Sequence, residues 1–332
     1  MTTPLISTRT MVGLGKAIAV ALGNKELRAA MDVSGLPDIS LFTHCAYLPH
    51  LGQLTFLAEA TRRSEGRLPQ ILASQLRVSD YGAFGGYVTG GKTFGAALAR
   101  TGTGIPWHTS HDRTSLSRRG DAVRLTYTSH VRHAFGYSSY APLAAFVMQS
   151  IAAPYFGYNS VSQLVRIDAP RQGALSEWER LFGCEVRFDC DSLSLDFDID
   201  LLSRPRFDPR PTTTTIEDVV RESSRQAPQD FVGVTEQLIR LAVLDGVVRL
   251  DAVAAQLRLG PRTFRRRLET EGLTFRKLVA QHRASRATEL LGDGAFTVRE
   301  IALSLGYSDT AHFIRAFKRE TGRTPGEMLN VS

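Results

Sequence analysis

The chain has 332 residues, which is enough for two domains that each bury a hydrophobic core. Apolar residues make up 43% and charged residues 22%, which excludes an intrinsically disordered chain. No apolar run approaches the roughly 20 residues of a membrane span. The net charge of +7 permits a polyanionic partner, and three cysteines are too few for a disulfide framework, so we expect a protein of the reducing cytoplasm.

Residues 14–80 are predicted to be mainly helical. Three stretches show apolar side chains at the spacing of a helix: 16–22, 52–64 and 70–76. Gly35 and Pro37 predict a break between the first two. The first stretch runs directly into Asn24-Lys25-Glu26 without a good cleavage site, so we interpret it as a helix and not as a signal peptide.

Residues 86–93, GYVTGGKT, match the pattern GxxxxGKT of a phosphate-binding loop. In such a loop the amides surround the phosphates, the lysine reaches them and the last hydroxyl binds magnesium. The pattern needs a buried strand before it and a carboxylate-ended strand after it, and neither is evident here. We expect instead a glycine-rich turn that leads into a helix from Thr93 to Arg100.

Four histidines form two HxxH pairs: His108 with His111, and His130 with His133. Imidazoles are good zinc ligands. The second pair, however, lies in or just after residues 123–131, which alternate as in a strand, where residues three apart point to opposite faces. We therefore expect ordinary pocket or surface histidines and assign no metal.

The middle of the chain alternates strands and helices. We predict strands at 121–133 and 161–168, and helices at 142–151 and 175–182. Residues 184–190 and 192–199 then alternate apolar and polar side chains, and a turn at Asp191-Ser192 would join them as a hairpin with one apolar face. The fold class of residues 1–203 is therefore predicted as α+β.

Residues 204–229 are predicted to form a linker because proline and threonine are dense there. A short helix at 216–223 can interrupt it. Residues 231–244 then predict the first helix of a second domain, 230–332, with Leu238 and Leu241 turned inward.

This second domain contains two helix-turn-helix patterns. Residues 251–271 give a helix, a turn ending at Gly260 and a helix at 261–270 that starts with Pro261. Residues 298–322 repeat the plan with Gly306 in the turn and a second helix at 309–320, capped by Ser308 or Asp309. An amphipathic helix at 274–291 joins them. The first of these second helices buries Phe264 and Leu268, and the other buries Phe313, Ile314 and Phe317. Both turn basic residues outward, as a helix that enters a DNA major groove does.

Two such units joined by one long helix resemble the DNA-binding domain of the AraC family of bacterial transcription regulators. The resemblance rests on LETEGLTFRKLVAQHRASRATELL from Leu268 and on TVREIALSLGYSDTAHFIRAFKRETGRTP from Thr297. Two positions depart from the family pattern: Gly260 replaces the usual capping serine, and GEMLN (residues 326–330) replaces the aromatic residue and arginine after the final Thr-Pro.

The resemblance implies which side chains contact DNA. Matching to the family pattern gives Arg262, Arg266, Thr310, His312 and Arg315 as base contacts. Basic neighbours are then expected at phosphates, and the full predicted set is Arg262, Thr263, Arg265, Arg266, Arg267, Thr310, His312, Arg315, Lys318 and Arg319. The joining helix is expected to hold the two readers about one DNA turn, roughly 34 Å, apart.

Residues 1–203 resemble the arabinose-binding-like regulatory domain of one branch of the same family. The resemblance rests on DYGAFGGYVTGGKTFGAALA from Asp80 and on WERLFGCEVRFDCDSLSLDF from Trp178. It implies a domain that binds a small-molecule effector and forms a homodimer. We choose as candidate effector-binding residues the aromatic and polar side chains of Trp107, His108, Tyr127 and Phe135.

These observations predict a non-enzymatic cytoplasmic regulator, with an activator favoured over a repressor. Its partners would be promoter DNA, RNA polymerase, an effector and a second copy of the chain, with no catalytic residue and no cofactor. Two alternatives stay open. One is an ATPase that uses residues 86–93 and Lys92, with the C-terminal domain for DNA targeting. The other is a metal sensor that uses His108, His111, His130 and His133.

Overall fold

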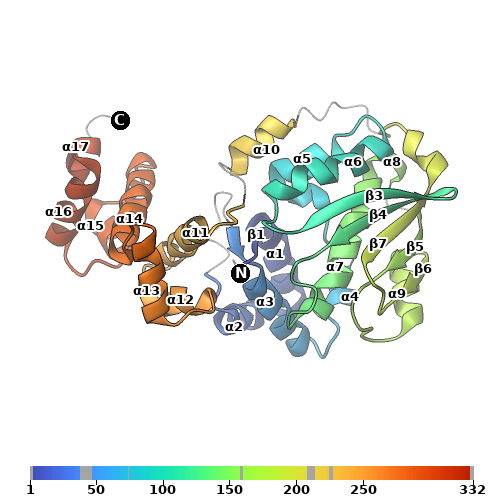
Figure 1. Ribbon diagram of the computed structural model, residues 1–332, viewed down its shortest axis with the longest axis horizontal. Helices are drawn as coiled ribbons and strands as arrows, with labels where there is room; N and C mark the ends of the chain where they lie inside the picture. Colours follow the sequence, from blue (N-terminus) through green and yellow to red (C-terminus); the bar gives the residue numbers. More distant parts are fainter. Residues whose placement is uncertain are drawn as a thin grey trace. The chain divides into compact units, whose positions relative to one another are not determined.

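The computed structural model describes residues 3–37, 47–73, 75–157, 160–207, 214–223 and 227–329 (Figure 1). Contacts divide the chain into an α+β unit, Pro4–Ala227, and a helical unit, Pro228–Ser332 with Met1–Thr3. The predicted fold class is thereby confirmed: an α+β part precedes an all-helical part. Cys184 and Cys190 are free thiols, while Cys45 and the linker residues 208–213 and 224–226 lie outside the described residues.

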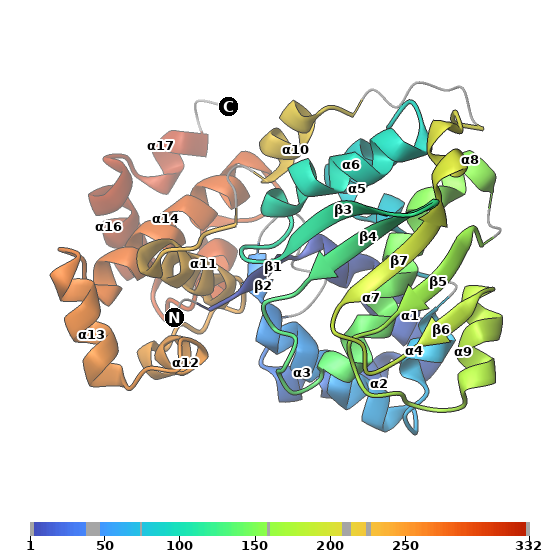
Figure 2. The same ribbon diagram turned by 45° about the vertical axis from the view of Figure 1, so that its right-hand side comes forward.

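A mixed sheet of five strands forms the centre of the α+β unit (Figure 2). Its order is β3-β4-β7-β5-β6, with β3 and β4 as an antiparallel hairpin and β7 antiparallel to both β4 and β5. The strands are β3 (Arg113–Arg119), β4 (Ala122–Thr128), β5 (Ser162–Arg166), β6 (Glu185–Arg187) and β7 (Leu193–Asp198). A separate antiparallel pair joins β1 (Leu5–Ser7) to β2 (Tyr47–Pro49).

The predicted hairpin of residues 184–190 and 192–199 is wrong. β6 and β7 do not pair with each other, because β5 lies between them and β6 runs parallel to β5. Alternation of apolar and polar residues in the sequence identifies the buried face of a strand but does not determine which strand pairs with it. β7 also lacks the expected solvent face, since Ser194 and Asp196 are buried.

Arginines from the neighbouring strands explain how Asp196 is tolerated inside the sheet. Arg124 of β4 and Arg166 of β5 each donate to it at 2.7 Å. Burial alone would raise the pKa of Asp196, but these hydrogen bonds hold that pKa below its ordinary value. The carboxylate therefore stays charged and joins three strands.

Helices cover the sheet in successive layers. α7 packs on β7, α6 on β3 and α9 on β6, while α3 and α4 pack on α7 (Figures 1 and 2). The longer helices are α1 (Arg9–Leu22), α2 (Asn24–Ser34), α3 (His50–Arg63), α6 (Phe94–Gly104) and α7 (Tyr137–Gln149). The shorter ones are α4 (Leu68–Leu72), α5 (Gly82–Thr89), α8 (Ala153–Phe156), α9 (Leu175–Phe182) and α10 (Ile216–Ser223).

α10 forms inside the segment predicted as a linker and belongs to the α+β unit. Val219 is 1% exposed and joins the hydrophobic core of this unit. Glu222 forms an ion pair with Arg9 and accepts a hydrogen bond from the backbone N–H of Ala83, at the start of α5. The connection to the helical unit is thus attached to the α+β unit over part of its length.

The helical unit is organised around α14 (Phe275–Gly292), which packs against α11, α15, α16 and α17. The other helices are α11 (Phe231–Leu244), α12 (Leu250–Gln256), α13 (Pro261–Thr270), α15 (Val298–Ser304), α16 (Thr310–Thr321) and α17 (Pro325–Leu329). The pairs α12–α13 and α15–α16 are the two predicted helix-turn-helix units. Phe264, Phe313 and Phe317 are almost completely buried and fix the second helix of each pair.

The two turns share one backbone design. The N–H of Leu259 bonds to the carbonyl of Ala254, and the N–H of Tyr307 bonds to that of Ala302, both at 3.0 Å. The left-handed residue is Gly306 in the second turn, as the sequence predicted, and Arg258 in the first. Gly260 instead has extended backbone at the N-cap of α13 and offers no side-chain cap.

Candidate nucleic-acid interface and ligand cavity

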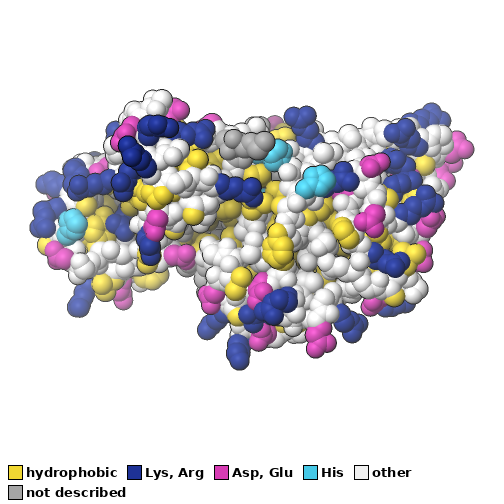
Figure 3. All heavy atoms as spheres, turned by 60° about the horizontal axis from the view of Figure 1, so that its bottom comes forward, with side chains coloured by type: hydrophobic (Ala, Val, Ile, Leu, Met, Phe, Trp, Pro, Cys, Tyr) yellow, Lys and Arg dark blue, Asp and Glu magenta, His cyan; other side chains and the backbone are white. Residues whose placement is uncertain are grey.

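The two second helices expose the side chains that the sequence proposes as DNA contacts. On α13, Phe264 and Leu268 are buried while Arg262, Thr263, Arg265, Arg266 and Arg267 are exposed. On α16, His312, Arg315, Lys318 and Arg319 are exposed and Thr310 is half-buried. Figure 3 shows Lys and Arg side chains gathered on the helical unit, at the left of the view.

The charge on α13 is largely uncompensated. In the described part of the chain, no acidic group pairs with Arg262, Arg265 or Arg266. Arg267 differs, because its guanidinium lies 4.2 Å from the centre of the Phe231 ring and so contributes to packing within the unit. Free guanidinium groups of this kind can bind phosphates or the edge of guanine.

The start of α16 is fixed by its cap. Asp309 accepts hydrogen bonds from the backbone N–H groups of Ala311 and His312, each at 3.0 Å. These bonds lower the pKa of Asp309, so it stays ionised at neutral pH. The preceding helix, α15, has a complete capping box between Thr297 and Glu300. Both helices of this unit therefore begin at defined residues.

The α+β unit contains a cavity bounded by α1, α3, α5, α7 and the sheet. The cavity has a volume of about 90 Å³. Its described lining contains no Asp, Glu, Lys or Arg side chain. The polar groups in it are Thr10, Gln53, Tyr81, Thr101, His108, Thr114, Tyr127 and Tyr140.

Two of the four residues that the sequence suggested for an effector line this cavity. His108 and Tyr127 do so, whereas Trp107 is half-buried outside the lining and Phe135 is 79% exposed at the surface. Sequence reasoning missed Gln53 and Tyr140, which also face the cavity. Both lie in helices with apolar neighbours, and nothing local distinguishes them from surface polar residues.

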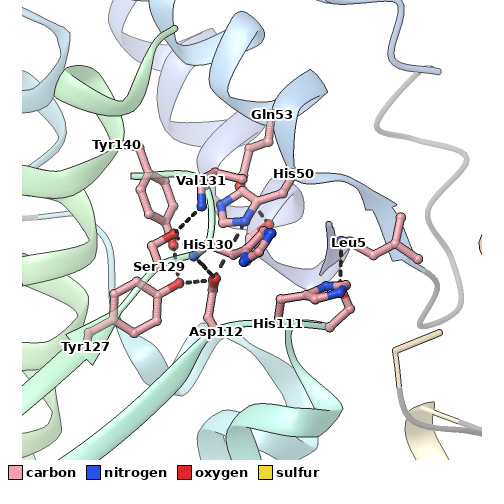
Figure 4. A network of polar contacts seen from close by, with 12 residues as sticks. Leu5, His50, Gln53, His111, Asp112, Tyr127, Ser129, His130, Val131 and Tyr140 are labelled. Carbon is pink, nitrogen blue, oxygen red and sulfur yellow. Dashed lines mark hydrogen bonds and ion pairs between the residues drawn. The ribbon is translucent and has the colours of Figure 1, made fainter. Parts of the chain in front are cut away.

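Asp112 organises a polar network beside the cavity (Figure 4). It accepts hydrogen bonds from the hydroxyl of Tyr127 and from the backbone N–H of His130, and His50 Nδ1 lies 3.7 Å away. Tyr127 in turn bonds to the hydroxyl of Tyr140 at 2.9 Å. Burial lowers the pKa of His50, which is therefore neutral at physiological pH, and raises the pKa of both tyrosines.

Residues 86–93 do not form a phosphate-binding loop. Residues 86–89 are the end of α5, Thr93 caps α6 by accepting from the N–H of Ala96, and Lys92 is exposed. The glycines permit close packing instead. A Cβ at Gly86 would lie 2.8 Å from Thr214 Oγ1, and one at Gly91 would lie 2.5 Å from the backbone N of Ala97. The expected helix after a glycine-rich turn is confirmed, because residues 90–92 lie between α5 and the Thr93 cap of α6.

The four histidines do not gather at one point. His111 and His130 have ring centres 5.0 Å apart, but His108 is buried between aromatic rings and His133 is exposed. The described residues contain no group of three or more His, Cys, Asp or Glu side chains arranged to hold a metal ion. No helix in the same part of the chain is long and apolar enough to cross a membrane.

Comparison with known families agrees with this geometry. Residues 26–206, more than half of the chain, match the model of the arabinose-binding domain of AraC transcription regulators, and residues 253–330 match a helix-turn-helix domain. The chain belongs to the AraC family of transcription regulators. The family that the sequence resembles is thereby confirmed, and it accounts for both units of the fold.

Relatives of this AraC-family chain include other regulators. It is 31% identical over 156 residues to the transcriptional regulator VirS of Mycobacterium tuberculosis, covering 46% of this chain and 45% of VirS. It is 32% identical over 157 residues to VqsM of Pseudomonas aeruginosa, covering 46% and 48%. The matched part thus spans about half the length of these relatives. The crystal structure of CdpR from Pseudomonas aeruginosa aligns over 92% of this chain and 97% of CdpR, with 22% identity and a TM-score of 0.37.

Proposed function

We propose that this protein is a cytoplasmic, effector-responsive transcription activator that reads two successive major grooves of promoter DNA with α13 and α16. The observation that carries the proposal is the pair of helix-turn-helix units whose second helices expose arginines. Within the described residues, Arg262, Arg266 and Arg315 form no ion pair. Arg262, Arg266 and Arg315 are the proposed base contacts, with Thr310 and His312 beside them. Thr263, Arg265, Arg267, Lys318 and Arg319 are the proposed backbone contacts.

A gel-shift titration against the DNA upstream of its own gene tests this reading. Arg266→Ala and Arg315→Ala should each weaken binding by about 1–3 kcal/mol and relax the preference for one base pair. Lys318→Ala should weaken binding to all sequences. It should also reduce the slope of log affinity against log salt concentration by about 1, the contribution of one phosphate contact. Arg118→Ala, which removes the same charge from β3 of the α+β unit, is the matched control.

Sequence-indifferent binding that both arginine variants leave unchanged would refute the proposal. The +7 charge would then act only as a non-specific attraction. Loss of binding in Arg118→Ala equal to that in Arg266→Ala would refute the assigned residues, because charge alone would account for both.

The cavity of the α+β unit is the proposed effector site, and its walls continue into the connection to the helical unit. Phe84 and Val88 of α5 line the cavity, and the backbone N–H of Ala83 in the first turn of α5 donates to Glu222 of α10. Ala227, the last residue of the unit, donates its N–H to the carbonyl of Pro106 at 3.4 Å, between the lining residues Ile105 and His108. An effector that moves either wall therefore moves the chain that leads to α11.

Regulation then follows if the effector binds more tightly to one arrangement of this connection than to another. We propose that the responsive species is a homodimer, so that two chains read two sites, and that the DNA-bound dimer contacts RNA polymerase. Analytical ultracentrifugation with and without promoter DNA measures the first claim. Transcription from that promoter with purified polymerase measures the second, and a monomeric protein that never alters transcription would contradict both.

A further inference from the structure

We infer that the cavity binds an uncharged, mainly apolar small molecule that presents hydrogen-bond donors to Gln53 and Tyr140, and not a sugar or an ionised metabolite. This inference deepens the proposed effector function and depends on it only for the consequence at DNA. It rests on the composition of the cavity wall and on two acceptor atoms that the protein leaves without a donor.

The wall excludes charged and highly hydroxylated ligands. Its described lining is mostly aliphatic and aromatic and holds no ionised side chain that could neutralise a carboxylate, phosphate or ammonium group. An unpaired charge buried there would lose its hydration without compensation. A monosaccharide carries several hydroxyl groups, each of which needs a partner in a site that excludes water, and the aliphatic part of this wall offers none.

Gln53 has a fixed orientation that leaves one acceptor free. The hydroxyl of Thr10 donates to the carbonyl of Ser7 at 2.8 Å, so its oxygen can only accept from Gln53, which lies 2.8 Å away. The amide must therefore point Nε2 toward Thr10. Its Oε1 is buried and has no partner within the described residues, in a side chain that is only 2% exposed. A ligand hydroxyl or N–H group would satisfy this oxygen.

The Tyr140 hydroxyl oxygen is a second acceptor, as the assignment of the hydroxyl protons shows. The single proton of the Tyr127 hydroxyl goes to Asp112, so in the Tyr127–Tyr140 contact of 2.9 Å the donor is Tyr140. The Tyr140 oxygen has then given its proton away and keeps lone pairs for a donor from the ligand. Figure 4 shows Tyr140 and Gln53 near His50, which is neutral and whose ring centre lies 5.0 Å from that of Tyr140.

The remaining wall favours an apolar body. His108 stacks on Phe84 with ring centres 4.5 Å apart and on Tyr81 at 5.2 Å. Burial lowers the pKa of His108 to about 3, so this ring is neutral and acts as a third aromatic surface. The ligand that fits this cavity therefore has hydrogen-bond donors at one end and is apolar elsewhere.

Matched probes test the inference on the full-length protein. Both tryptophans, Trp107 and Trp178, lie in the α+β unit, so their fluorescence reports binding and unfolding of that unit alone. Decanol and thymol should bind, and their methyl ethers, which keep the apolar body but lose the donor, should bind roughly 3- to 10-fold more weakly. Decanoate, decylammonium and L-arabinose should not raise the unfolding temperature of the unit.

Two variants locate the donor-accepting atoms. Decanol and thymol each carry a single hydroxyl proton, so the preference for alcohol over ether should fall toward one in whichever of Gln53→Leu and Tyr140→Phe removes the acceptor that this proton uses. An unchanged preference in both variants would contradict the assignment. Thr114→Val is the control, because the Thr114 hydroxyl lines the cavity but already bonds to Thr101 at 3.0 Å. Its preference should match that of the wild-type protein.

Three outcomes would overturn the inference: alcohols and ethers that bind equally, a charged probe or arabinose that binds as tightly as decanol, or no binding by any uncharged probe. A gel shift of the same protein separates this failure from failure of the proposed function. If the protein binds DNA specifically but binds no probe, only the proposed class of ligand is refuted. If it binds the probes but does not bind DNA specifically, only the proposed function as a transcription regulator is refuted.

Discussion

Replacing Gly306 with alanine should strongly destabilise the helical unit. Gly306 has a φ of +76°, and a Cβ there would lie 2.0 Å from the carbonyl oxygen of Gly246. The left-handed backbone alone costs an alanine about 1–2 kcal/mol. Forcing apart two packed backbone segments adds about 1–3 kcal/mol. The expected loss in the free energy of unfolding is therefore about 2–5 kcal/mol.

Gly322→Ala is the matched control for this change. Gly322 ends α16 with a φ of +79°, almost the same backbone conformation, but nothing lies within 4 Å of its Cβ position. It should lose only the conformational part, about 1–2 kcal/mol. For a unit of this size each kcal/mol lowers Tm by about 4–8 °C. Gly306→Ala should therefore lower Tm by roughly 10 °C or more, and Gly322→Ala by about half as much.

Two signals measured on one sample distinguish the units. Far-ultraviolet circular dichroism follows all helices, whereas tryptophan fluorescence follows only the α+β unit, because Trp107 and Trp178 both lie there. Gly306→Ala should lower the dichroism transition of the helical unit and leave the fluorescence transition in place. Equal shifts for the two glycine variants would show that the approach of Gly306 to Gly246 contributes nothing, and the reasoning would be wrong.

Three further changes have expected outcomes. Arg258→Gly should stabilise the helical unit by about 1 kcal/mol in denaturant unfolding, because Arg258 holds a φ of 55° at the position that Gly306 fills in the second turn. Burial lowers the pKa of His108 from 6.5 to about 3, so the unfolded chain binds more protons between these values and stability is lost as pH falls below 6.5. At pH 5 the loss from this group is about 2 kcal/mol, since 1.5 pKa units separate 5 from 6.5, and His108→Phe should flatten the fluorescence-detected pH dependence. Glu222→Gln should speed amide exchange in α10 by about 5- to 10-fold, whereas Arg221→Gln on its exposed face should not.

The helical unit could be predicted almost residue by residue. Its helices are amphipathic, and their ends are marked by local chemistry: Pro261 at the start of α13, Asp309 before α16 and Gly306 in the turn. Each of these signals acts within a few residues of the element that it fixes. The left-handed backbone of Arg258 could not be predicted, because an arginine gives no local sign of that conformation.

The α+β unit was less predictable because its decisive contacts join residues that are far apart in the sequence. β5 separates β6 from β7, which no alternation within residues 184–199 can show. The glycine-rich segment matched a phosphate-binding pattern, although Gly86 and the preceding Gly82 pack against Thr214 and Glu222, more than 120 residues later in the chain. Gln53 and Tyr140 belong to a site only because α3 and α7 pack together around His50.

The packing of α10 against α5 also suggests how ligand binding in the cavity can affect the helical unit. A Cβ at Gly82 would lie 2.6 Å from Glu222 Oε1, so any side chain larger than hydrogen would displace the Glu222 carboxylate from the start of α5. The same α5 supplies Phe84 and Val88 to the cavity wall. α10 is therefore seated directly on an element that a ligand touches, and the chain continues from α10 through Ala227 to the helical unit. If this contact carries the signal, Glu222→Gln should leave probe binding and effector-free DNA binding intact while reducing the change in DNA affinity that the probe produces. Full coupling in this variant would require a route that bypasses α10.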